Sequence, residues 1–484
     1  MRLRTLCAAT GVAAALAACS FAPRYEVPAV PVGEHYKEAA GGWQPATPAD
    51  HLARGTWWTL YGDAELDALA ARIETASPNL AAALARYEQA TAVQDQIRSA
   101  LYPNAALNGT IARDRESEMN PPQGSTARHY NTNQLGASAS YEVDLWGRVR
   151  DSVRAGEANL AAAAADLESA RLSLQAALVD DYVQLRGLDT DLKLLQDTVA
   201  AYQKTLELTA RRQQGGIASG LDVARARTQL QTVKAQLDTA AAARAQLEHA
   251  IAVLVGESPS TFAIAARTEP LALPTIPPGI PGELLQRRPD IAAAERRTAA
   301  ANASVGVART AWFPTLSLNA SLGYASFEHS DWFKASNLFW SIGPGLALEL
   351  FDGGLRAGRL RQARAVLDEA GANYRATALG AFAEVEDQLA LLDRYRTASE
   401  QQQLAVGAAL QAQDYALTRY RAGIVNYLEV TTAQTAALQA QRDALSLQTR
   451  RLRGSVALIR ALGGGWTAPS DPTQPATAMT DGGR

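Results

Sequence analysis

The fold of this chain is decided by a repeated segment, Ser77-Pro78-Asn79-Leu80-Ala81-Ala82-Ala83 and its copy Arg288-Pro289-Asp290-Ile291-Ala292-Ala293-Ala294. Each copy opens a run of helix-forming residues that ends at a second proline, Pro103 or Pro314. Both intervals are 25 residues (103 − 78 and 314 − 289), and the copies align without a gap at an offset of 211. Proline is tolerated at the start of a helix but not in its interior. The spacing therefore predicts two structural repeats, each beginning with one helix.

Apolar residues alternate with polar ones after each second proline, which is the period of a strand rather than of a helix. The alternating positions are Leu107, Gly109, Ile111, Leu135, Ala137, Ala139, Tyr141, Val143 and Leu145 in the first repeat, and Leu316, Leu318, Ala320, Leu322, Tyr324, Trp340, Ile342, Leu346, Leu348 and Leu350 in the second. Each run approaches the roughly 10 residues with which a tilted strand crosses an outer membrane. We therefore expect two hairpins with four strands in all, joined by polar loops near residues 113–129 and 327–331.

These strands fit either a soluble sandwich with one solvated face or part of a membrane barrel. Aromatic residues at the helix-proximal strand ends favour the barrel, whose membrane interfaces carry aromatic girdles. They are Tyr102, Trp146, Trp312, Phe313 and Phe351. Four strands leave two open edges, which lipid does not tolerate, so the chain would have to oligomerise. A dimer would supply 8 strands and a trimer 12, with room for a pore; the strand pattern does not choose between them.

Two long helical runs follow the hairpins, from about residue 147 to 214 and from about 354 to 422. At 1.5 Å per residue, each helix would be roughly 100 Å long, which exceeds any globular core. Shorter helices are predicted over residues 221–255 and 428–462. We expect the long helices to pack beside stacked pairs of shorter ones, with alanines allowing close approach.

A glycine turn separates the helices of each pair. Residues 420–429 contain Gly423 and residues 211–223 contain Gly215 and Gly216. The two turns are copies at an offset of 207, which sets Gly216 against Gly423. Glycine accepts the left-handed conformation that ends a helix, and the Ser219 or Asn426 that follows can cap the next helix. Each turn should therefore reverse the chain tightly.

The N-terminal residues predict an exported protein. Two arginines precede the apolar run from Leu6 to Ala18, which is too short to span a bilayer and reads as a signal peptide. Leu16-Ala17-Ala18-Cys19 resembles the bacterial lipobox, in which the cysteine becomes the lipidated first residue. The alternative is an ordinary signal in which Cys19 is incidental. Because Cys7 leaves with the signal, the mature chain has no cysteine for a disulfide or a thiolate metal site.

Composition argues against several function classes. A net charge of −3 over 484 residues offers no basic excess for nucleic acid, and no later segment reaches the roughly 18 apolar residues of a membrane helix. The five histidines show no paired ligand spacing and accompany no nucleophile motif; they are His35, His51, His129, His249 and His329. We therefore expect no enzyme, no metal site and no cofactor other than a lipid on Cys19.

The chain divides into ten segments. They are a signal peptide (1–18), an N-terminal tether (19–62), the first helical part of repeat 1 (63–102), hairpin 1 (103–146), the long and short helices of repeat 1 (147–255), a proline-rich crossover linker (256–282), the first helical part of repeat 2 (283–313), hairpin 2 (314–351), the long and short helices of repeat 2 (352–462) and a disordered tail (463–484). Trp57 and Trp58 are expected to pack the tether against the body rather than to bind a ligand.

The order and spacing of these features resemble a TolC-like outer-membrane factor of the lipoprotein (NodT-type) branch. The resemblance covers residues 21–462 and rests on the duplicated helix-hairpin-helix unit, on Trp57-Trp58, on residues 141–148 and 350–354, and on the two glycine turns. It implies a homotrimer in which a 12-stranded outer-membrane barrel continues into an α-helical periplasmic tunnel. It also implies outer-membrane lipid, a periplasmic adaptor and an inner-membrane pump as partners, and export of drugs, metals or other small molecules.

The resemblance further implies a gate at the two turns. Residues at the positions of Tyr420 and Asp222 tend to link the closed tip in this family, and Leu428, Glu429 and Thr432 occupy its pore-facing positions. Lipoprotein relatives commonly have aspartate where Thr432 stands, so Glu429 is expected to replace that charge and Leu428 to form an apolar constriction. The alternative is that Asp222 and Glu429 only favour helix starts.

Two other function classes stay open from the residues alone. A structural or adhesive coiled-coil lipoprotein would use the same helices without transport. A periplasmic adaptor should carry one helical hairpin between β-rich segments, whereas this chain has two tandem copies of one unit.

Overall fold

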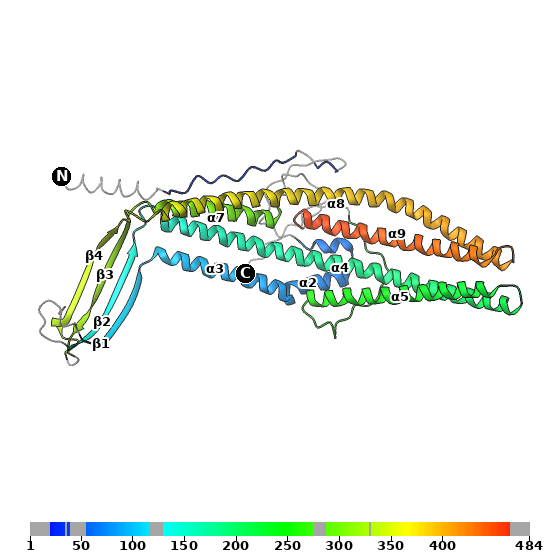
Figure 1. Cartoon of the computed structure of the whole chain (residues 1–484), viewed down its shortest axis with the longest axis horizontal. Coiled ribbons are helices and arrows are strands. Elements are labelled where there is room, and N and C mark those ends of the chain that lie inside the picture. The colour runs from blue at the N-terminus through cyan, green and yellow to red at the C-terminus, as the bar shows by residue number, and fades with distance from the viewer. Residues whose placement is uncertain are drawn as a thin grey trace, which may run out of the picture. The chain divides into compact units, whose positions relative to one another are not determined.

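The computed structural model describes residues 20–33, 36–38, 55–115, 129–274, 276, 287–328 and 331–464. The predicted signal and Cys19 lie outside these ranges, as do residues 34–35 and 39–54 of the tether, 116–128 and 329–330 of the polar loops, 275 and 277–282 of the crossover linker, 283–286 that follow it, and 465–484 of the tail. Figure 1 shows the order of the elements.

The helices repeat as predicted. They are η1 (Trp57–Tyr61), α2 (Ala64–Ala76), α3 (Pro78–Arg98), η2 (Ser99–Leu101), α4 (Arg148–Gln214), α5 (Gly220–Leu254), α7 (Pro289–Thr310), η3 (Ala335–Asn337), α8 (Leu355–Arg421) and α9 (Tyr427–Ala461). The long helices α4 and α8 have 67 residues each, and α5 and α9 have 35 each. Their starts differ by the predicted 207 positions (355 − 148 and 427 − 220). No helix in the described ranges combines the length and the apolar character needed to span a bilayer.

The four strands form one antiparallel sheet in chain order. They are β1 (Asn104–Arg115), β2 (His129–Glu142), β3 (Thr315–Ser326) and β4 (Leu338–Ala347). The β2–β3 pair joins the two repeats, from Asn133 opposite Ser326 to Glu142 opposite Ser317. β1 and β4 are therefore the edges. Pro344 lies in β4, where an edge strand tolerates its missing N–H.

Two strands end earlier than predicted. β2 stops at Glu142, because the Asp144 carboxylate turns to accept hydrogen bonds from Val149 N and Arg150 N at the start of α4. β4 stops at Ala347, whose partner Thr315 is the first residue of β3. Leu348 and Leu350 therefore have no strand beside them and do not extend the alternation.

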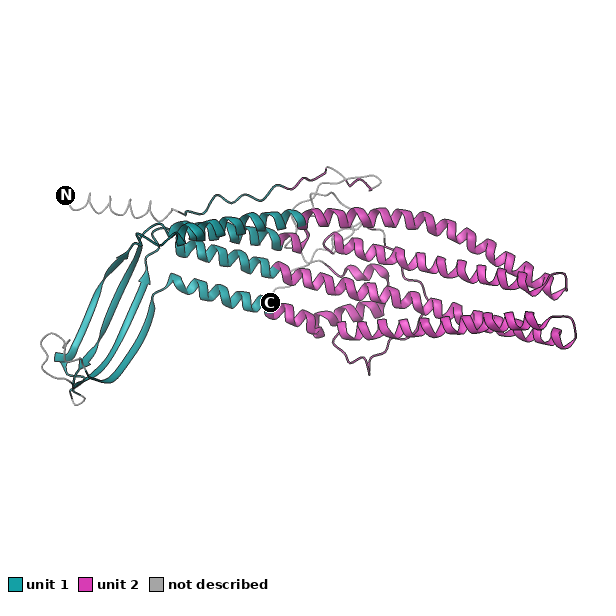
Figure 2. Cartoon of the chain, in the orientation of Figure 1, with its two compact units in different colours: residues 1–29, 86–164, 293–376 teal, residues 30–85, 165–292, 377–484 magenta. Residues whose placement is uncertain are grey.

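The described chain falls into two compact units, coloured separately in Figure 2. Unit 1 (residues 1–29, 86–164 and 293–376) contains the whole sheet and the helix segments that adjoin it. Unit 2 (residues 30–85, 165–292 and 377–484) contains both glycine turns and the largest apolar core. Each unit takes segments from both repeats, so neither repeat folds as a separate body.

The core of unit 2 includes the paired tryptophans. Trp57 and Trp58 are buried with Tyr61 against α4 and the C-terminal part of α9, which confirms their packing role. Residues 57–61 form η1 and belong to this core instead of to an extended tether. Asp63 caps α2 by accepting from Glu65 N and Leu66 N, as expected.

A buried ion network holds the described start of the crossover linker onto unit 2. The fully buried Asp189 carboxylate binds Arg186 at 2.8 Å and Arg244 at 2.6 Å, and it also accepts from the backbone N–H of Arg267. Arg186 and Arg244 donate in turn to the carbonyls of Ala265 and Ile264. Each buried charge is thus paired, as a buried charge requires. The described start of the linker is therefore held against α4 and α5 by hydrogen bonds and is not an unattached connection.

Candidate functional site

One face of the sheet is apolar and open to the surroundings. The register places Leu107, Ala137, Leu322 and Trp340 in one row across all four strands. Leu107 is 74% exposed and Trp340 is 70% exposed. The parallel row of Ala105, Ala139, Ala320 and Ile342 continues the same face. A contiguous exposed apolar surface of this kind marks contact with lipid or with another protein.

The opposite face is polar. Its rows contain Asn104, Ser140 and Asn319, then Ser138, Ser321 and Ser341. Ser140 donates to the Asn319 side chain, and Asn108 donates to Ser138, so hydroxyls and amides form hydrogen bonds across the strands. Such a sheet has one surface suited to lipid and one suited to water.

Phe339 is a large apolar residue on the polar face. Its ring covers a glycine pair in the neighbouring strands: a Cβ placed on Gly136 would lie 3.1 Å from the ring, and one on Gly323 would lie 2.9 Å from it. An aromatic ring over strand glycines fills the gap that their missing side chains leave. The ring therefore lies against the sheet instead of projecting from it.

The five predicted aromatic residues lie at the helix-proximal end of the sheet, in two environments. Tyr102, Trp312 and Phe351 are exposed, with Phe351 at 87%, and Trp312 carries the Arg356 guanidinium 4.9 Å from its ring centroid. Trp146 and Phe313 are half-buried and stack on each other at 4.9 Å. The Trp146 indole donates to the Pro314 carbonyl at 2.7 Å.

A second aromatic group at the other end of the sheet was missed by the sequence analysis. Tyr324 contacts Phe333 edge to face at 5.6 Å, and Trp332 stacks on Phe333 at 5.4 Å. Tyr130 contacts Phe327 in the same way at 5.6 Å. The signal was present in the sequence as Phe327 at the start of the predicted polar loop and as Trp332 and Phe333 directly after it. Aromatic residues thus mark both ends of the strands.

The two glycine turns are structural copies, at one end of unit 2 (Figure 2). Gly216 and Gly423 have φ of 74° and 76°, the left-handed conformation that glycine adopts without strain. Gly216 N donates to Gln213 O and Ile217 N to Arg212 O. At the offset of 207, Gly423 N donates to Tyr420 O and Ile424 N to Arg419 O. Both turns use the helix-ending pattern predicted for them.

Tyr420 and Asp222 each have partners within the chain. Tyr420 is 3% exposed; its hydroxyl donates to Thr209 Oγ1 at 3.3 Å, and its ring contacts Tyr427 edge to face at 5.5 Å. Burial raises the pKa of Tyr427 to about 12. Asp222 accepts from the N–H and the hydroxyl of Ser219 and completes a capping box at the start of α5. One chain does not bring the phenol and this carboxylate together.

Leu428, Glu429 and Thr432 lie on one exposed side of the first turns of α9. The Thr432 hydroxyl donates to Leu428 O at 3.0 Å and is thereby turned back onto the helix. Glu429 makes no ion pair with any residue that the structure describes. Asn426 Oδ1, not Glu429, accepts from the N–H of Leu428 and caps α9. The Glu429 carboxylate is therefore free to act on solutes or on another chain.

Arg212 bridges the two turns, and the sequence analysis did not single it out. Its Nη1 donates to the carbonyls of Tyr420 at 2.7 Å and Arg421 at 3.2 Å, which lie in the last turn of α8. Its guanidinium also lies 4.7 Å from the centroid of the Tyr420 ring. The only sequence feature that points to Arg212 is that the second turn has an arginine, Arg419, at the equivalent position, 207 residues later. The side chain of Arg419 makes no such bridge among the described residues.

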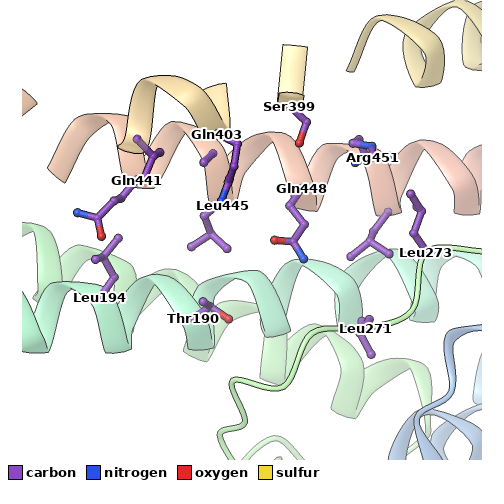
Figure 3. Close-up of a pocket in the computed structure, with 13 residues that line it drawn as sticks. Thr190, Leu194, Leu271, Leu273, Ser399, Gln403, Gln441, Leu445, Gln448 and Arg451 are labelled. Carbon is purple, nitrogen blue, oxygen red and sulfur yellow. The ribbon is translucent and has the colours of Figure 1, made fainter. Parts of the chain in front are cut away.

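A cavity of about 430 Å³ lies between α4, α8 and α9 in unit 2 (Figure 3). Leucines such as Leu194 and Leu445 alternate in its wall with the amides of Gln403, Gln441 and Gln448. Ser399 has no histidine or carboxylate beside it in this lining, so the wall offers no activated nucleophile. Within the described ranges, no three histidines, cysteines or carboxylates gather as metal ligands.

The comparisons with known proteins agree with this geometry. The family model of the outer membrane efflux protein matches twice, over residues 69–257 and 280–464. The chain is 34% identical to the outer membrane protein OprJ of Pseudomonas aeruginosa over 94% of its length and 95% of that protein. It is 33% identical to the toluene efflux pump outer membrane protein TtgF of Pseudomonas putida, over 96% of this chain and 97% of the relative. The solved structure of the outer-membrane channel OprN matches with a TM-score of 0.82 and 30% identity, over 93% of this chain and all of that one.

Proposed function

The chain belongs to the outer membrane efflux protein family, and from that premise we propose that three copies form the exit duct of a tripartite efflux pump. The observation that carries the proposal is the two-faced sheet. Its exposed apolar rows face lipid, and its rows of serine and asparagine face water. In a closed barrel these two surfaces become the outside and the lumen.

The number of copies follows from the sheet edges. β1 and β4 have unpaired backbone groups, which hydrocarbon does not tolerate. Pairing β4 of one chain with β1 of the next closes the sheet. Two copies would give 8 strands, whose lumen side chains fill, whereas three give 12 strands and an open passage. A passage is what export requires, so the trimer is the assembly that fits the function.

The proposed partners and cargo follow from membership of the outer membrane efflux protein family. The long polar helices form the periplasmic tunnel, and their tips meet a periplasmic adaptor that connects the duct to an inner-membrane pump. The cargo is small molecules handed on by that pump, such as drugs or metals. The relatives carry names that refer to different efflux systems, and the pump rather than the duct selects among substrates.

Cys19, which lies outside the described residues, is the proposed lipid anchor. Its thiolate displaces the phosphate-ester group of a phospholipid to form a diacylglyceryl thioether, and the thiol proton leaves with that group. Hydrolysis of the Ala18–Cys19 bond then frees an amine, which takes an acyl group from a second phospholipid. The mature chain thus starts one residue before Ser20, held at the outer membrane.

The resting gate is the ring of turns at the tunnel tip. Three chains place six turns around the axis, with Leu428, Glu429 and Thr432 exposed just beyond one turn of each chain. Arg212 ties the first turn of each chain to the second and holds that pair closed. Tyr420 supports the same contact from inside the hairpin, and Asp222 is proposed to link to a neighbouring chain.

Purified trimer in liposomes tests the duct. We expect release of trapped ions and small sugars, but not of proteins, because the lumen of a 12-stranded barrel admits only small solutes. Liposomes that contain correctly inserted trimer and retain every solute, even when the tip turns carry loosening substitutions, would assign the protein to the structural or adhesive class.

Replacing Glu429 with glutamine should weaken the preference of the channel for cations. Three exposed carboxylates near the tip attract cations and repel anions, so their removal should bring the cation-to-anion permeability ratio towards one. Reversal potentials in a salt gradient measure this ratio. The control is Glu429→Asp, which keeps the charge and should keep the preference. An unchanged ratio in Glu429→Gln would leave that carboxylate with no role in selectivity.

A further inference from the structure

The N-terminal residues of the described chain are fastened to unit 1 by specific contacts. The Ser20 hydroxyl donates to Asp151 Oδ1 at 2.8 Å. The Phe21 carbonyl accepts from Arg309 at 3.0 Å, and the Pro23 carbonyl accepts from Asn302 at 2.8 Å. Successive hydrogen bonds to a segment without regular structure show that its position is built into the fold.

Asp151 is the most unusual member of this group. It lies in the first turn of α4 with a side chain that is 0% exposed. Its Oδ1 accepts from Ser20 and from Arg154 at 3.0 Å, but its Oδ2 is buried and has no hydrogen-bond partner among the described residues. A buried carboxylate oxygen without a donor is costly, so a donor is expected to reach it in the mature protein.

Gly306 of α7 shows where that oxygen lies. A Cβ placed on Gly306 would be 2.4 Å from Asp151 Oδ2 and 2.8 Å from Ala22 N. The free oxygen therefore lies between α7 and the N-terminal segment, on the side of Asp151 from which that segment approaches. The absence of a side chain at Gly306 allows the segment to come this close.

We propose that Asp151 docks the lipid-modified N terminus: Oδ2 accepts the amide N–H of the acylated Cys19, one residue before Ser20. This inference rests on the lipidation proposed above. After signal cleavage and N-acylation, that amide is the first donor of the mature chain. Its neighbour Ser20 already binds the other oxygen of the same carboxylate, which brings the amide within reach.

The contacts of Phe21 indicate what docking the N terminus achieves. Its ring stacks on Phe313 at 4.6 Å, and Phe313 stacks on Trp146, so the anchored residues join the aromatic group at the helix-proximal end of the sheet. Such groups mark the membrane interface of a barrel. The acyl chains on Cys19 thus start at the level at which the barrel enters the membrane. The anchor is held in a fixed position on unit 1.

Hydrogen exchange of the native lipoprotein, purified as full-length trimer from membranes and measured by mass spectrometry, tests the dock. The mass of the N-terminal peptide first reports whether Cys19 carries the lipids. In the wild type, we expect slow exchange over residues 19–22. In Asp151→Asn, exchange there should be at least about 10-fold faster, because the amide presents a donor where Oδ2 accepted. Gly306→Ala should have the same effect by pushing the segment away.

Gly358→Ala is the control, since nothing lies within 4 Å of a Cβ placed there, and its N-terminal peptide should exchange like the wild type. Unchanged exchange in peptides from α7 and α8 shows that the Asp151→Asn trimer is folded. A lipidated protein whose residues 19–22 exchange equally fast in wild type and Asp151→Asn would overturn the dock and leave the lipidation standing. An unmodified Cys19 would contradict both the lipidation and the docking of the lipidated N terminus. Channel activity is tested separately by solute release.

Discussion

Replacing Gly323 with alanine is expected to abolish the assembled protein in the outer membrane. A Cβ at this position would lie 2.4 Å from the carbonyl oxygen of Leu135 and 2.6 Å from the Cα of Gly136, both backbone atoms of β2. A backbone neighbour in a paired strand cannot move aside as a flexible side chain can. The cost therefore exceeds the ~1–3 kcal/mol that is usual for overpacking.

The location increases the effect of Gly323→Ala, because β2 and β3 join the two repeats and each trimer carries the clash three times. The measurement is the amount of heat-modifiable trimer in membrane fractions. Gly343→Ala is the matched control: it lies in the adjacent strand β4, and a Cβ there meets nothing within 4 Å. Wild-type amounts of Gly323→Ala trimer would show that the β2–β3 pairing is not as close as described.

Replacing Arg212 with alanine is expected to raise the resting conductance strongly. The substitution removes the charge-assisted hydrogen bonds to the Tyr420 and Arg421 carbonyls and the contact with the Tyr420 ring. Such a set is worth about 2 kcal/mol in a half-buried position. If it exists only in the closed tip, its loss shifts the balance between closed and open forms by about 30-fold for each chain.

Arg419→Ala is the control for Arg212→Ala, because Arg419 occupies the equivalent position of the second turn and its side chain makes no bridge among the described residues. Resting currents of the two variants and the wild type in planar bilayers provide the comparison. Equal resting currents in all three would remove Arg212 from the gate. A rise in both variants would attribute the effect to lost charge at the tip rather than to the bridge.

Element boundaries could be predicted because the sequence marks them twice. Pro78 and Pro289 begin α3 and α7, and the left-handed Gly216 and Gly423 lie two residues beyond α4 and α8. Because the pattern occurs twice, each boundary signal in one repeat is supported by the equivalent residue in the other. The predicted limits of the long helix in repeat 2, residues 354 and 422, differ from those of α8 by one residue at each end.

Contacts between distant residues could not be predicted. The hydroxyl of Tyr420, which was predicted as a tip residue, donates to Thr209, 211 positions away in the chain, and no periodicity indicates such a pair. The same holds for Arg212, for Phe339 over the strand glycines and for Ser20 on Asp151. The contacts of Arg212 and Phe339 depend on how the two repeats pack together, and that of Ser20 depends on where the N-terminal segment lies on α4, which the pattern within one repeat does not contain.

Single-channel recording tests most directly whether this protein is a tip-gated exit duct. Purified trimers would be inserted into a planar bilayer, with the wild type and Arg212→Ala compared in the same salt. We expect discrete current steps for each inserted trimer, small in the wild type and clearly larger and longer-lived in Arg212→Ala. Trimers that insert and yet carry no current in either form would contradict the duct and leave a structural lipoprotein.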